Sequence, residues 1–142
     1  MTGLISVKTL YAALLLNGAK SVEVRRSPVR LNEGDVLAVY ATVPTGMVMG
    51  AVTVARVETL GVNEFLRNNR MTGAACITDY AARRYLEGAR QATLICVRNP
   101  VQWDVEKQVS LRELRTVEPS FKPPQVWRRL SPAICARLGI PA

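Results

Sequence analysis

The sequence contains no histidine in its 142 residues. This absence excludes Ser-His-Asp and Cys-His catalysis, and it also excludes zinc or haem held by imidazole, because each of these needs a histidine side chain. Any chemistry must therefore rest on Lys, Glu, Asp, Tyr, Cys or Thr. We expect no bound metal and no cofactor.

Cysteine is also scarce, and the three cysteines form no CxxC pair. An odd number of isolated cysteines does not indicate a disulfide framework, so Cys76, Cys96 and Cys135 predict a reducing, cytoplasmic environment. The apolar stretch near the N-terminus has no basic region before it, and its uncharged run is too short to cross a bilayer. We expect no targeting segment and no membrane partner.

Acidic side chains are few relative to basic ones. There are 19 Lys and Arg against 11 Asp and Glu, which gives a net charge of +8. This balance favours a polyanionic partner, and nucleic acid is favoured over a membrane because no helix has a clustered cationic face. The excess is spread along the chain rather than gathered in a tail. A biased codon usage would also enrich Arg, so charge alone does not establish the partner.

The composition is that of a folded domain. Hydrophobic residues make up 49% of the chain and charged residues 21%, and the mean hydropathy is +0.09. A chain of this length buries roughly two thirds of its unfolded surface and needs no disulfide or metal to fold. We expect one domain over residues 1–142.

The spacing of apolar residues predicts five or six strands and several short helices. The expected strands are 4–7, 21–26, 36–41, 47–57, 91–98 and 101–109, and the expected helices are 8–17, 61–69, 78–87, 110–114 and 131–139. Residues 68–75 are expected to form a loop. Glu23 and Arg25 should share one side of their strand, and Gly50 should mark a bulge or bend. Such a pattern is typical of a small closed or partly open β-barrel with helical covers.

Several motifs occur in a familiar order. They are Lys8-x-x-Tyr11, Gly18-x-Lys20-x-x-Glu23-x-Arg25, Gly34-Asp35, Tyr40-Ala41-Thr42-x-Pro44 and Gly50, followed by residues 85–88, 110–115 and 123–127. Together they resemble the ASCH domain of the PUA-like superfamily over nearly the whole chain. The resemblance implies a mixed α/β (α+β) fold, a PUA-like small β-barrel of five to six strands with short covering helices. Two positions depart from the pattern: Thr9 stands where Pro is frequent, and Thr42 where Ser is common.

The resemblance also implies an RNA-binding cleft beside the GxKxxExR strand and the Tyr40 strand. We therefore expect binding of RNA or another single-stranded nucleic acid, in a module that could regulate transcription or translation. Lys20 would supply a mobile charge for phosphate, Arg25 and Arg26 planar forks, and Tyr40 a stacking face, while Glu23 would contact a base edge or hold Arg25. The candidate binding residues are Lys20, Glu23, Arg25, Arg26, Tyr40, Thr42 and Gln125.

Simpler interpretations stand beside these roles. Glu23 could simply form an exposed ion pair with Lys20 or Arg25 on the strand surface. Tyr40, which lies in an apolar strand, could simply be a core residue. Replacing Lys20 or Arg25 with Ala is expected to weaken binding and leave the melting temperature nearly unchanged.

Some ASCH proteins are ribonucleases, and a small group consists of amidohydrolases that act on acetylated cytidine. In that group a nucleophilic Thr follows the motif Lys by three residues, whereas this sequence has Glu23, which does not replace a hydroxyl nucleophile. If the protein is an enzyme, the candidate catalytic residues are Lys20, Glu23 and Tyr40. Lys20, which should keep its ammonium beside Glu23, would stabilise phosphorane charge while Glu23 or Tyr40 handles a proton.

The sequence thus leaves three alternatives open. The first is a nucleic-acid-binding module, and the second is a ribonuclease or modified-nucleoside hydrolase that uses the motif lysine. The third is an interaction module whose cleft holds a nucleotide-like ligand or a peptide. The oligomeric state is also left open.

Overall fold

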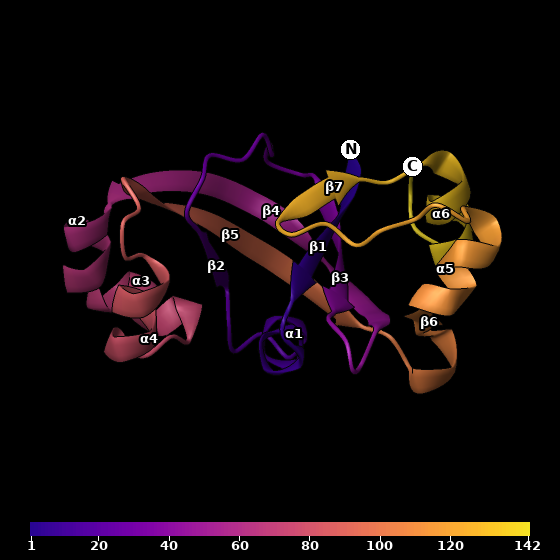
Figure 1. The fold of residues 1–142 in the computed structure, drawn as a ribbon, viewed down its shortest axis with the longest axis horizontal. Coiled ribbons are helices and arrows are strands. Elements are labelled where there is room, and N and C mark those ends of the chain that lie inside the picture. The colour runs from indigo at the N-terminus through magenta and orange to yellow at the C-terminus, as the bar shows by residue number, and fades with distance from the viewer.

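The computed structural model describes residues 1–142, which form one seven-stranded mixed sheet flanked by short helices (Figure 1). The strands are β1 (Thr2–Val7), β2 (Val22–Arg25), β3 (Val36–Ala41), β4 (Met47–Gly61), β5 (Gln91–Gln102), β6 (Val109–Ser110) and β7 (Trp127–Arg129). The helices are α1 (Thr9–Leu16), α2 (Val62–Arg67), α3 (Asn69–Ala75), α4 (Asp79–Tyr85), α5 (Leu111–Val117) and α6 (Pro132–Leu138), with a 3₁₀ turn η1 (Val105–Lys107). No helix is long and apolar enough to span a bilayer.

The sheet curls into a half-barrel, which confirms the predicted α+β barrel architecture. The strand order is β2-β5-β4-β3-β1-β7, with β6 beside β4. The end strands β2 and β7 do not pair with each other, so the barrel has an open seam. Helices α2, α3 and α4 gather at one end of the sheet, and α5 and α6 gather at the other (Figure 1).

Gly50 lies at an irregularity between β3 and β4, as predicted. Val39 pairs with Gly50 but Tyr40 pairs with Val48, so the register shifts by one residue there. A Cβ atom on Gly50 would lie 2.2 Å from the carbonyl oxygen of Val101. The close approach of β5 at this bulge therefore requires glycine.

Two predicted elements are wrong. Residues 69–75 form helix α3 rather than a loop, because the Asn68 side chain accepts a hydrogen bond from the Met71 amide and caps the helix. Residues 101–109 also do not form a strand of their own. β5 continues to Gln102, and the next strand, β6, begins only at Val109. Asn99 takes a left-handed φ of 51° at a register shift. Pro100 is tolerated there because β2 pairs only with residues 93–96, which leaves that edge of β5 open.

The core consists of three buried clusters. One lies beneath α1 and includes Leu15, Leu37 and Val52. A second packs α5 and α6 on the sheet, and a third packs α2, α3 and α4 on β2 and β5. The helices at the two ends of the sheet are therefore anchored by separate apolar contacts, and the open seam of the barrel lies between them (Figure 1).

Candidate functional site

A cleft of about 730 Å³ lies at the open seam. Its walls come from β1, α1, β2, the end of β3, α4 and the segment before β7. Six of the seven candidate binding residues line it: Lys20, Glu23, Arg25, Tyr40, Thr42 and Gln125. The structure thus brings together side chains that are as distant in the sequence as Lys20 and Gln125.

Arg26 is the exception among the candidates. It follows the last residue of β2, and its side chain is exposed. Its guanidinium lies near Gly88, where an added Cβ would be 3.8 Å from Arg26 Nη2. Arg26 is therefore not among the residues that line the cleft.

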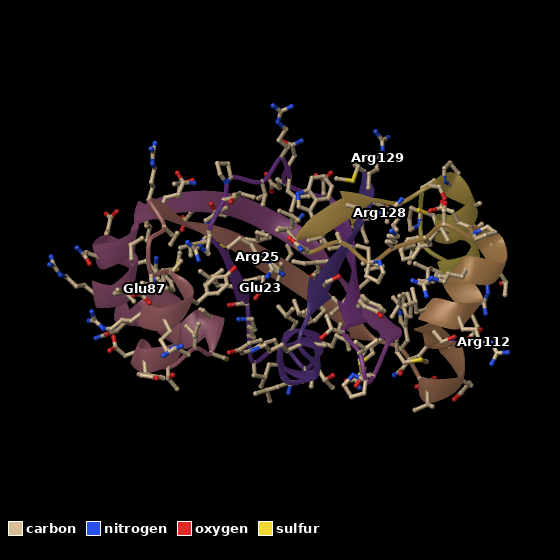
Figure 2. The ribbon with its side chains drawn as sticks, viewed as in Figure 1. Glu23, Arg25, Glu87, Arg112, Arg128 and Arg129 are labelled. Carbon is tan, nitrogen blue, oxygen red and sulfur yellow. The ribbon has the colours of Figure 1, made fainter.

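Glu23 is the centre of a buried charge network. Its Oε2 atom lies 2.8 Å from Arg25 Nη2, and its Oε1 atom lies 3.4 Å from Lys20 Nζ. The exposed side-chain fractions are 8% for Glu23, 12% for Arg25 and 3% for Lys20, so the exposed surface pair considered above is excluded. Figure 2 shows Glu23 and Arg25 in the middle of the molecule, between the α3–α4 end and β1.

Arg25 connects the two sides of the open seam. Its Nη2 atom donates a hydrogen bond of 2.9 Å to the backbone carbonyl of Ser6 in β1, and the same nitrogen forms an ion pair with the Glu23 carboxylate in β2. Because β1 and β2 share no backbone hydrogen bonds, this side-chain link fixes their separation at the cleft. Replacing Arg25 or Lys20 would leave the buried Glu23 carboxylate with one ion-pair partner in place of two. Those variants should therefore melt at a lower temperature than the wild type, contrary to the expectation from the sequence.

Lys20 is fixed in place and is not the mobile charge expected from the sequence. Its Nζ atom donates to the carbonyl of Ala75 and lies 4.7 Å from the centroid of the Tyr11 ring. Burial lowers the pKa of Lys20, and the opposing effect of Glu23 does not offset it. The Lys20 ammonium therefore loses its proton more readily than expected for a lysine beside a carboxylate.

Tyr40 lines the cleft but is only 2% exposed. It packs in the same buried cluster as Leu4 and Val48, and burial raises the pKa of its phenol. Its ring face is thus not available as the stacking platform expected from the sequence. The core interpretation of Tyr40 is the correct one.

Three side chains outside the predicted set of site residues also line the cleft. Lys8 is exposed and Tyr11 half-buried, both at the start of α1, and Tyr85 is 37% exposed on α4. The Lys8-x-x-Tyr11 spacing was a usable signal, since residues three apart share a helix face. Nothing in the sequence around Tyr85 indicated that it would line the cleft.

No group of three or more His, Cys, Asp or Glu side chains comes together that could hold a metal ion. The charged groups of the cleft are three cations, Lys8, Lys20 and Arg25, and one carboxylate, Glu23. The cleft therefore presents positive charge in a concave, partly apolar setting, which suits an anionic ligand.

The sequence matches the ASCH domain family over residues 5–110. The chain belongs to the ASCH domain family. The crystal structure of ASCH from Zymomonas mobilis has a TM-score of 0.89 and 25% identity, covering 97% of this chain and 93% of that one. A variant of that protein with one serine replaced by alanine has a TM-score of 0.89 and 25% identity, covering 97% and 94%. A variant with one tyrosine replaced by phenylalanine has a TM-score of 0.88 and 23% identity, covering 97% and 96%.

A comparison with curated proteins finds no match. The membership in the ASCH domain family and the PUA-like half-barrel confirm the resemblance given by the ordered motifs. The matched region holds most of the cleft residues, but it ends before Gln125 and the strand β7.

Proposed function

We propose that this ASCH domain binds RNA, or another single-stranded nucleic acid, in the cleft at the open seam. The observation that carries the proposal is the concentration of Lys8, Lys20 and Arg25 against the single carboxylate of Glu23. The net charge of +8 provides the long-range attraction to a polyanion.

The size of the cleft favours a single strand over a duplex. A volume of about 730 Å³ is in the range of pockets that enclose a small organic ligand, so it suits an unstacked nucleotide. Sequence-specific RNA recognition targets such splayed bases, which stack on aromatic rings and meet polar groups at their edges. Tyr85 offers an accessible ring on one wall. Glu23 and Arg25 offer an acceptor and a donor on another.

Binding should weaken steeply as salt rises. We expect a fluorescence-anisotropy titration with short single-stranded RNA to show tight binding at low salt, since each phosphate contact releases a counterion. Single-stranded DNA and duplex RNA are the matched probes, and the duplex should bind more weakly. The proposal is contradicted if no oligonucleotide binds, or if affinity is independent of salt, which would favour a nucleoside-like ligand or a protein partner.

The second candidate is a ribonuclease or modified-nucleoside hydrolase that uses Lys20. The buried position of Lys20 at the cleft and its lowered pKa favour it, because a lysine that loses its proton more readily is a better acid–base group. A gel run on the RNA after the titration separates the two functions. Cleavage that disappears in a folded Lys20→Met protein would establish the ribonuclease, and intact RNA would exclude cleavage of the strand.

A further inference from the structure

Helix α4 forms part of the cleft wall and also carries an aromatic residue outside it. Ala81 and Tyr85 line the cleft. Tyr80 precedes Ala81 and Arg84 precedes Tyr85. Tyr80 and Arg84, which are four residues apart, therefore form the neighbouring stripe along the same helix. The two stripes together extend from the cleft onto the open surface of α4.

Tyr80 is unusual in its exposure. Its side chain is 70% exposed, and it belongs to none of the three buried clusters. Arg84 lies over the ring, with its guanidinium carbon 5.8 Å from the ring centroid, and Arg84 Nη1 donates a 3.4 Å hydrogen bond to the Tyr80 hydroxyl. Arg84 contacts only part of the ring, so the rest of the Tyr80 ring is open to solvent.

Arg83, the residue before Arg84, is an example of an ordinary solvated side chain on this helix. Arg83 pairs with Asp79 one turn away at 2.8 Å, and both are more than half exposed. That pair needs no ligand to account for it. Arg84 has no acidic partner, so its charge remains available beside the Tyr80 ring.

We propose that Tyr80 and Arg84 form a second contact for single-stranded RNA, outside the cleft. In this arrangement the nucleotide that enters the cleft passes Tyr85, and an adjacent base stacks on the open face of Tyr80 while Arg84 meets a phosphate. The inference rests on the proposed function. It adds to that function that the protein contacts a strand of several nucleotides and not one isolated nucleotide.

The test compares variants on a fluorescein-labelled single-stranded RNA about ten nucleotides long, a length comparable to known single-strand binding sites. Tyr80→Ala should weaken binding about tenfold, the size typical for loss of one base-stacking contact. Tyr80→Phe keeps the ring and should bind within about twofold of the wild-type chain. Arg112→Ala is the control for a substitution outside the proposed contact, because Arg112 is exposed on α5 at the opposite end of the sheet (Figure 2). It should bind within about twofold of wild type.

Each outcome has a defined meaning. If Tyr80→Ala binds the RNA as well as the wild-type chain, or if Tyr80→Phe loses as much affinity as Tyr80→Ala, base stacking on Tyr80 is excluded while the cleft proposal stands. If the wild-type chain binds no RNA at all, the proposed function itself fails. Because Tyr80 is exposed, all variants should melt at the wild-type temperature, which a thermal scan verifies.

Discussion

Glu23→Ala is expected to lower the free energy of unfolding by about 3–5 kcal/mol. The substitution leaves Lys20 and Arg25 without their carboxylate although their side chains are 3% and 12% exposed. Removing one member of a buried ionic network is costly because the remaining charges are neither hydrated nor paired. Equilibrium unfolding in urea measures the change.

Glu58→Ala is the matched control for that experiment. Glu58 pairs with Arg56 at 2.9 Å, but the two side chains are 37% and 54% exposed. An exposed pair contributes about 0–1 kcal/mol, so this variant should unfold nearly as the wild type does. Equal, small effects for both glutamates would show that the Glu23 network is not buried as described.

Gly50→Ala is expected to destabilise the fold by about 3 kcal/mol or more. The added Cβ would lie 2.2 Å from the Val101 carbonyl oxygen and 2.7 Å from Leu16 Cδ2. A side chain could rotate away, but the carbonyl belongs to β5, so the two long strands would have to separate. At this chain length the loss corresponds to a fall in melting temperature of roughly 6–12 °C.

Gly73→Ala is the control for the effect of glycine itself. Gly73 lies in α3, and nothing is within 4 Å of the position of an added Cβ. Replacing an unstrained helical glycine with alanine stabilises by about 0.5–1 kcal/mol, so this variant should melt slightly higher. A Gly50→Ala protein as stable as Gly73→Ala would contradict the close approach of β5 at the bulge.

Features that depend on a few neighbouring residues were predictable from the sequence. Strand 36–41 is found with the expected limits. Ser110 and Glu113 form the expected capping box, and Thr78 caps α4 as expected. The alternation along β2 placed Glu23 and Arg25 on one side, and the bulge at Gly50 followed from a glycine inside a β-branched segment.

The environment of the site residues was not predictable in the same way. Lys20 is buried because the Ala75 carbonyl at the end of α3 and the Tyr11 ring on α1 enclose its ammonium. Local patterns predict a loop over residues 68–75, so they do not indicate that this segment covers Lys20. Tyr40 is likewise enclosed by α5 and α6 residues that are distant in sequence. Burial of both side chains is a property of tertiary packing, which local patterns do not contain.

Lys8 lies at the cleft where we propose that nucleic acid binds, so its substitution tests that placement most directly. Lys8 is exposed at the cleft and takes part in no ion pair, so Lys8→Glu should leave the fold intact. Arg112→Glu makes the same charge change on α5, far from Glu23 and Arg25 (Figure 2). Both variants are titrated by anisotropy against the same single-stranded RNA at low salt.

Lys8→Glu should lose affinity by at least about tenfold, because it places a carboxylate where a phosphate should lie. Arg112→Glu should lose far less, since only the overall charge has changed. Equal losses in the two variants would show that binding follows net charge and not the cleft. No loss in either would contradict the assignment of the cleft as the binding site.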